Sequence, residues 1–280
     1  NKLEATYREK IVKANAENDM DADKELAKKL PYREMSKNGW VPETRDITEK
    51  VIHLRKYFEV VKLEIIENMQ LSKIACRRLA KTEKSDLALL AWAQKAKLEA
   101  RSIDISLVDL KTLKKSLPEI RNMTTMNPSD FCPKLIELLS SCGIALIFLP
   151  HIGGSFLHGA TFYDGNKIVV GLTVRGKDAD IFWFSLFHEL GHILLGHINQ
   201  PNGTTEEDEK AADSFAKETL IPTEEFNAFT TQNDFSKAAI CAFAQEEHIL
   251  CGVVVGRLQK EGFINYNCCN DLKTKYTLSA

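Results

Sequence analysis

Long hydrophobic runs are missing from this 280-residue chain. No stretch reaches the roughly 18 uninterrupted apolar residues that a membrane-spanning helix needs. The most apolar segment, residues 181–195, contains two histidines and a glutamate. A secretory signal pattern is also missing. We therefore expect a protein of the cytoplasm that does not have a membrane as a partner.

Cysteine motifs are missing as well. The chain has seven cysteines, an odd number, and no Cys-x-x-Cys pair. Cys268 and Cys269 are adjacent, and neighbours in sequence rarely form an unstrained disulfide. This pattern indicates unpaired thiols in a reducing compartment and does not support a zinc site built from cysteine.

A strong net charge is also absent, since the whole chain carries only −2. Residues 1–150 have 27 Lys and Arg against 22 Asp and Glu, a net charge of +5, and residues 151–280 have 10 against 17, a net charge of −7. The acidic half is unsuited to binding DNA through its phosphates. The mixed charges of the first half are typical of a solvated helical surface.

Helical periodicity dominates residues 1–125. We expect helices over residues 3–16, 23–30 and 45–60, the last capped by Thr44, and a further helix that begins at Ser85 and Asp86. Trp92 lies beside the apolar stripe of that helix and is expected in the core. A stripe of leucines follows and ends at Pro118. We predict that residues 1–125 form a helical region.

The pattern changes at about residue 126. A helix over residues 130–141 precedes a short apolar run, Ile144 to Leu149, that predicts a buried strand. Asp164-Gly165-Asn166 then separates two β-forming segments, which is a strong hairpin signal. The fold class that we expect is therefore α+β, with residues 126–280 forming a domain around a small sheet.

The motif His188-Glu189-Leu190-Gly191-His192 lies in an apolar helix of about four turns, which Gly196 can end. His188 and His192 are four residues apart, so they project from one helix face and can bind one Zn²⁺. Glu189 is rotated off the metal axis and is suited to act as the general base toward water. Because buried polar groups are costly without partners, a metal centre explains this helix better than a purely structural role.

A third ligand is expected from the helix that follows. His197 is one residue out of register for a third histidine of the metzincin type, and we interpret it as a polar residue at the helix end. Glu209 is the predicted ligand and would complete a His₂Glu site, with Asp213 on the same face orienting a histidine ring. Glu206 and Asp208 remain alternatives. Ala212, Ala216 and Phe215 are suited to close packing on the motif helix.

These residues carry a resemblance. The run from His188 to Leu195, followed by Glu209-x-x-x-Asp213-x-Phe215-Ala216 and Leu220-Ile221-Pro222, resembles the ImmA/IrrE family of zinc metallopeptidases over about residues 126–265. The resemblance implies a zincin-like domain with Zn²⁺ as cofactor. It also implies a bacterial or phage protein of the cytoplasm, whose protein or peptide substrate is a repressor-type regulator.

The chain is more specifically similar to the C-terminal part of proteins that join an XRE-type helix-turn-helix domain to this peptidase. Residues 1–8 resemble the stretch just after that domain, and the resemblance implies that residues 1–125 are a helical connector region. DNA binding is then expected only through an N-terminal domain that this sequence lacks. Some such relatives are regulators or antitoxins in toxin–antitoxin systems, and the organisation is compatible with a homodimer.

Three subsidiary expectations concern substrate and partners. The strand over residues 167–174 is either an edge strand that pairs with a peptide substrate or an interior strand. His158, Tyr163 and Arg175 are candidate donors to a developing oxyanion. Residues 236–262 outline a helix-turn-helix, although packing against the peptidase is the favoured interpretation because few basic residues face a phosphate.

The rival function is a metal-stabilised regulatory or antitoxin module without significant proteolysis. Glu189 counts against this alternative, because a purely structural zinc ion does not need that carboxylate.

Overall fold

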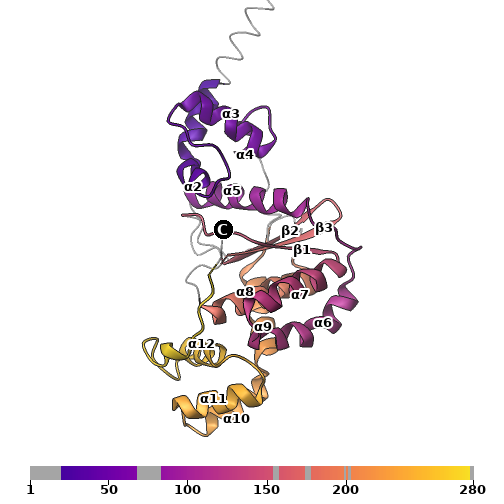
Figure 1. The fold of residues 1–280 in the computed structure, drawn as a ribbon, viewed down its shortest axis with the longest axis vertical. Coiled ribbons are helices and arrows are strands. Elements are labelled where there is room, and N and C mark those ends of the chain that lie inside the picture. The colour runs from indigo at the N-terminus through magenta and orange to yellow at the C-terminus, as the bar shows by residue number, and fades with distance from the viewer. Residues whose placement is uncertain are drawn as a thin grey trace, which may run out of the picture. The chain divides into compact units, whose positions relative to one another are not determined.

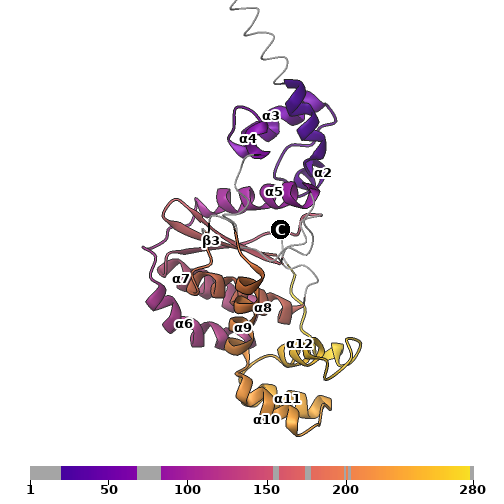
Figure 2. The ribbon, with the colours of Figure 1, turned by 180° about the vertical axis from the view of Figure 1, so that it is seen from behind.

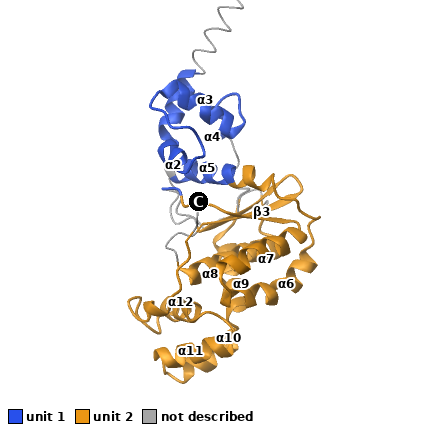
Figure 3. Cartoon of the chain, in the orientation of Figure 1, with its two compact units in different colours: residues 1–71, 79–95, 152–156 blue, residues 72–78, 96–151, 157–280 orange. Residues whose placement is uncertain are grey.

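The computed structural model describes residues 20–67, 83–153, 158–173, 178–198, 200 and 203–277. The described chain is mostly helical with one three-stranded sheet, which confirms the predicted α+β class (Figure 1). The helix expected over residues 3–16 lies outside the described residues. The chain divides into two compact units, one of residues 1–71, 79–95 and 152–156, the other of residues 72–78, 96–151 and 157–280 (Figure 3).

The first unit is helical. Residues 20–29 form a helix, and α2 (Tyr32–Lys37), α3 (Ile47–Phe58), α4 (Glu64–Glu67) and the first part of α5 (Glu83–Ala100) follow. The carboxylate of Asp23 accepts hydrogen bonds from the backbone of Leu63 and the guanidinium of Arg55. Trp92 is fully buried, as predicted. Asp46, rather than the predicted Thr44, caps α3, because its carboxylate accepts the amides of the first turn.

The second unit holds the remaining elements, which run in chain order: α6 (Leu110–Asn122), the 3₁₀ turn η2 (Met123–Thr125), α7 (Pro128–Ser141), β1 (Ile144–Phe148), β2 (Gly159–Asp164), β3 (Lys167–Leu172), α8 (Ala179–Leu194), α9 (Glu206–Leu220), α10 (Thr223–Thr231), α11 (Lys237–Glu246), α12 (Cys251–Glu261) and the 3₁₀ turn η3 (Asn270–Leu272). Figure 2 shows α7 and α8 on one face of the sheet, with α10, α11 and α12 on the side of α8 and α9 away from it.

The sheet has the strand order β1-β3-β2. β1 pairs with β3 in parallel, with Ile144 opposite Ile168, and β2 pairs with β3 antiparallel through the predicted turn after Asp164. The central strand is therefore β3. Of the two alternatives left open for residues 167–174, the interior strand is the one observed for β3, because both of its edges are already paired.

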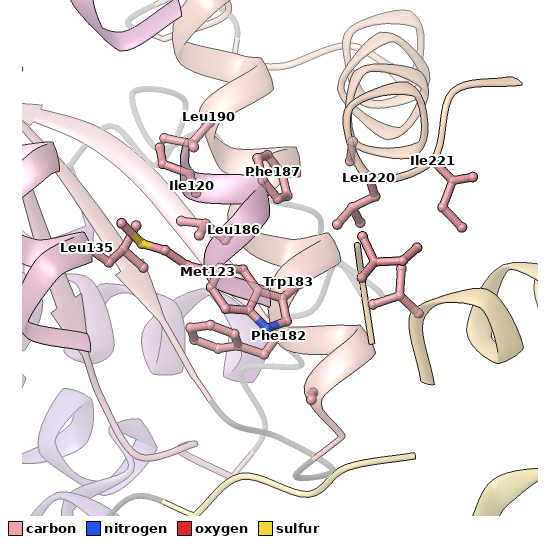
Figure 4. Packing of buried hydrophobic residues seen from close by; sticks show 14 of the residues in the cluster. Ile120, Met123, Leu135, Phe182, Trp183, Leu186, Phe187, Leu190, Leu220 and Ile221 are labelled. Carbon is pink, nitrogen blue, oxygen red and sulfur yellow. The ribbon is translucent and has the colours of Figure 1, made fainter. Parts of the chain in front are cut away.

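Helix α8 forms the centre of the hydrophobic core. Its apolar side chains pack against α6, α7 and the sheet, so that most of its sixteen residues are buried. Figure 4 shows Phe182, Trp183, Leu186, Phe187 and Leu190 of α8 among residues of α6, α7 and the end of α9. A helix buried on nearly all sides is rigid, and it fixes the side chains that it carries.

Helix α6 contradicts one expectation, because it continues through Pro118. Proline in a helix interior costs about 3 kcal/mol through its missing N–H and its clash with the preceding turn. Leu113 and Ile120 lie two turns apart on one face and are both fully buried in the core of the second unit. Their burial offsets that cost.

One of the boundaries between the compact units follows residue 95, within α5. Helix α6 packs with the second unit, although it precedes residue 126 in the sequence. The predicted division into two domains, residues 1–125 and residues 126–280, stays a prediction.

Candidate metal centre

Helix α8 presents three polar side chains of the motif. His188, Glu189 and His192 are 4%, 2% and 0% exposed, in a helix whose other positions are mostly apolar. The two histidines lie one turn apart, with ring centroids 4.6 Å apart and an interplanar angle of 83°. Their Nε2 atoms face each other at 3.0 Å. The spacing in sequence therefore produces the predicted convergence.

Helix α9 brings a carboxylate to the same place because it packs very closely on α8. A Cβ atom on Gly191 would lie 3.0 Å from the ring of Phe215 and 3.4 Å from the Cα atom of Ala212, so glycine permits this approach. Ala212 and Ala216 are fully buried in the contact, as predicted. The first turn of α9 starts with a capping box between Thr205 and Asp208, and Glu209 follows directly.

The three predicted ligands converge. Glu209 Oε2 lies 3.3 Å from His188 Nε2, and Glu209 Oε1 lies 3.5 Å from His192 Nε2. These three residues form a group that could hold a metal ion. Ligand atoms about 2.0–2.1 Å from one tetrahedral Zn²⁺ lie about 3.3 Å from one another, which matches these separations.

The surroundings of Glu209 also fit a cation. Both of its carboxylate oxygens are buried, and neither has a hydrogen-bond partner of good geometry among the described residues. Burial raises the pKa of Glu209, but the nearby His188 and His192 outweigh this effect and hold the pKa well below its usual range. An ionised and buried carboxylate without hydrogen bonds is costly unless a cation binds it. The donor set of two imidazoles and one carboxylate suits zinc.

Asp213 lies where the sequence predicted it, beside a histidine ring. The Nδ1–H of His188 donates to Asp213 Oδ1 at 2.9 Å, which leaves the Nε2 lone pair directed toward His192 and Glu209. Burial lowers the pKa of His188, but the hydrogen bond to Asp213 and the nearby carboxylates of Glu209 and Glu189 outweigh it and raise the pKa to about 9 when no cation is bound.

The side chain of Glu189 contacts strand β2, whereas the two histidines face Glu209 of α9. Thr161 donates a hydrogen bond of 2.5 Å to Glu189 Oε2. A Cβ atom on Gly159 would lie 2.7 Å from Glu189 Oε1, so glycine makes room for the carboxylate. Burial raises the pKa of Glu189, against the lowering effect of His188, His192 and Thr161. A carboxylate with a raised pKa is suited to exchanging protons near neutral pH.

Sequence reasoning missed the environment of His197. Gly196 adopts a left-handed conformation with φ of +77°, and the chain turns so that the Nδ1 atoms of His197 and His192 are 3.1 Å apart. His197 Nε2 lies 3.4 Å from Asp208 Oδ1. The interpretation of His197 as a residue that only meets the helix dipole is therefore incomplete. No sequence signal pointed to this contact, because it depends on the turn after α8 and on the position of α9.

A cavity of about 680 Å³ adjoins the motif helix. His188 and Glu189 contribute to its lining, and so does His158, one of the three predicted oxyanion donors. Its other walls come from α8, α9, α12 and the segment around η3, with Ile181, Phe184, Leu220 and Val253 among the apolar lining residues. Polar chemistry beside an apolar cavity is the usual arrangement of a substrate site.

The remaining candidates have other surroundings. Tyr163 is 45% exposed and is not among the residues that line this cavity. Arg175 lies outside the described residues.

Arg257, which the helix-turn-helix alternative would need for DNA, instead lies over the ring of Phe226 and donates to the carbonyl of Ile221 and to Glu261. Helix α12 packs on α8, so its favoured interpretation as a packing element fits the structure.

Comparison with known families gave one match. Residues 161–258, about a third of the chain, match the IrrE N-terminal-like domain family, Peptidase_M78. The match runs from β2 to α12, so it covers Glu189 and the three predicted ligands, and it supports the resemblance to ImmA/IrrE metallopeptidases for this part of the chain. No curated protein matches the chain. The fusion to an XRE-type domain stays a prediction.

No single helix in the described part of the chain is long and apolar enough to cross a membrane. Helices α11 and α12 pass that test only when they are taken together, and they are bent by 115° at the break between them.

Proposed function

We propose that this protein is a zinc-dependent endopeptidase, with His188, His192 and Glu209 as metal ligands and Glu189 as the general base. The observation that carries the proposal is the convergence of these three ligand atoms within 3.0–3.5 Å, beside a second, differently held carboxylate. A bound Zn²⁺ would supply Lewis-acid chemistry by lowering the pKa of water and polarising the scissile carbonyl.

In this proposal Glu189 carries both proton transfers, and two neighbouring residues hold the side chains of the site in position. Thr161 holds Glu189 Oε2, so we assign Oε1 to take the proton of the attacking water. The same oxygen then passes that proton to the amide nitrogen that leaves. Asp213 keeps the ring of His188 in one orientation during these steps.

An extended peptide can add to the sheet at β2. This strand pairs with β3 on one side, and no described strand pairs with its other side. Because Thr161 and Gly159 of β2 contact Glu189, a peptide paired along this edge would lie next to the base. The role first considered for residues 167–174 thus passes to β2 in our proposal.

The environment of Glu189 favours an enzyme over a module that only carries a metal. A structural zinc ion needs closed coordination and no additional acid. Here a carboxylate that is 2% exposed is held by its own hydrogen bond beside a cavity. Burying this carboxylate is costly and a structural zinc site does not need it, so its presence favours a role in the reaction.

The substrate in this proposal is a repressor-type regulatory protein in the cytoplasm, as the resemblance implies. The test is to incubate the purified protein with a regulator encoded beside it, with and without a zinc chelator, and to detect fragments by mass spectrometry. We expect cleavage that the chelator stops and that added zinc restores. Bound zinc without cleavage of any offered regulator or peptide library would favour the regulatory-module alternative.

A further inference from the structure

His192 differs from His188 in the partner of its outer ring nitrogen. The Nδ1–H of His188 donates directly to a carboxylate, that of Asp213. The Nδ1 of His192 instead faces another imidazole nitrogen, Nδ1 of His197, at 3.1 Å. Two neutral imidazoles in this arrangement share a single proton between the facing nitrogens, so one ring must donate and the other must accept.

The direction of this hydrogen bond decides whether His192 can bind a metal. If His197 donates, the proton of His192 resides on Nε2, which faces His188 Nε2 and Glu209, and the ring has no lone pair there. If His192 donates, its Nε2 lone pair is directed toward these two groups. Only the second tautomer is a ligand.

Asp208 selects the second tautomer. Its Oδ2 accepts from the backbone N–H of Thr205 at 2.9 Å and from the Thr205 hydroxyl at 3.0 Å, and its Oδ1 lies 3.4 Å from His197 Nε2. A carboxylate oxygen at this distance attracts an N–H and repels a lone pair. It therefore favours a proton on His197 Nε2, which leaves His197 Nδ1 as the acceptor for His192.

We infer that His197 and Asp208 are positioning residues, which hold His192 in the tautomer that binds the metal. This inference rests on the proposed function, because it concerns the same metal centre. The first turn of α9 then has two roles, since Glu209 supplies a ligand and its neighbour Asp208 prepares another ligand through His197. The geometry is local and rigid, because His192 is 0% and His197 is 9% exposed.

The test measures the zinc affinity of the whole chain by competition with a chromophoric chelator. Loss of a residue that orients a ligand typically weakens metal binding about 10–100-fold. We expect His197→Leu to lose affinity in this range and Asp208→Asn to lose less. His197→Asn keeps an acceptor near His192 and should recover part of the loss. Glu207→Gln is the matched control, because it neutralises the adjacent exposed carboxylate and should leave the affinity unchanged within about twofold.

Two further measurements separate positioning from folding. The melting temperature of the zinc-free His197→Leu protein should stay near that of the wild type. In the zinc-free wild type, where no metal dictates the tautomer, long-range ¹H–¹⁵N NMR spectra of the imidazoles should show a proton on Nδ1 of His192 and on Nε2 of His197. This readout needs no variant, so it decides the matter even if His197→Leu does not fold.

The outcomes distinguish this inference from the proposed function. Wild-type affinity in His197→Leu, or the opposite tautomer at His197, overturns the positioning role and leaves the peptidase proposal standing. A wild-type protein that binds no zinc at all overturns both.

Discussion

Thr161 on β2 donates a 2.5 Å hydrogen bond to Oε2 of Glu189 on α8. The donor and the acceptor are 28 residues apart in the sequence, and both are buried. This bond ties the proposed general base to the edge strand of the sheet, and it fixes which oxygen of the carboxylate remains for the reaction.

We predict that Thr161→Val lowers kcat about 10- to 100-fold and changes KM little. Valine has the shape of threonine without the hydroxyl, and a buried hydrogen bond to a charged group is worth about 1.5–3 kcal/mol. Steady-state kinetics with a cleaved peptide measures this effect. Thr161→Ser restores the donor and should recover most of the rate, whereas equal losses in the two variants would show that packing is responsible.

Gly159→Ala should also impair Glu189, for a steric reason. The new Cβ atom would lie 2.7 Å from Oε1 and 2.9 Å from Cγ of Glu189 and 3.0 Å from the side chain of Leu172. The carboxylate must therefore move, and displacement by about 1 Å can cost about 10²-fold in rate. Zinc content and melting temperature are the controls. Full activity in this variant would show that Glu189 does not need its observed position.

Glu189→Gln and His188→Ala should fail in different ways. Glutamine keeps the size of glutamate but cannot accept a proton, so cleavage should fall at least about 10²–10⁴-fold while zinc stays bound. His188→Ala removes a ligand and should release the metal. Metal analysis and a cleavage assay of both proteins make the comparison. If Glu189→Gln keeps the biological activity in cells that His188→Ala destroys, the protein is a metal-stabilised regulator.

The stability of the zinc-free protein should fall as the pH rises from about 6.5 to about 9. The partners of His188 raise its pKa from 6.5 to about 9, so its protonated form stabilises the fold fully below pH 6.5 and this stabilisation is lost as the pH passes 9. A shift of this size corresponds to about 3 kcal/mol. Urea unfolding at several pH values with a chelator measures the loss.

Two controls accompany this pH series. Added zinc should flatten the dependence, since a metal-bound imidazole does not take up a proton in this range. Asp213→Asn removes the hydrogen-bonded carboxylate of His188 and should shrink the loss. A zinc-free wild type with constant stability from pH 6 to pH 9 would contradict the prediction.

Cys241 on α11 and Cys251 on α12 should form a disulfide under a mild oxidant. Their sulfur atoms are 2.9 Å apart, closer than those of two ordinary thiols in contact. Burial and the nearby Cys241 raise the pKa of Cys251 to about 11, so its alkylation should accelerate about tenfold per pH unit below that value. Mass spectrometry after diamide treatment detects the bond, with the buried Cys142 as an internal control that should stay reduced.

Local pattern was enough to predict the elements near the site. The hairpin after Asp164 and the four-turn motif helix are confirmed, because each rests on signals within a few residues. The expected end of a helix at Pro118 is wrong, because core burial offsets a local preference there. The strand after the hairpin could not be assigned to an edge or to the interior from sequence, since that depends on β1, which pairs with it from an earlier part of the chain.

The sequence by itself determined which two histidines could share one metal ion, because helix geometry places His188 and His192 on one face without reference to the rest of the chain. It also pointed to Glu209, through acidic residues and small residues at helical spacing. Only the tertiary structure decided how these groups are held. The contacts of Thr161 with Glu189, and of Asp208 with His197, join separate elements, and their distances depend on how β2 and α9 pack against α8. Packing of this kind depends on many side chains at once, so no spacing along the chain reveals it.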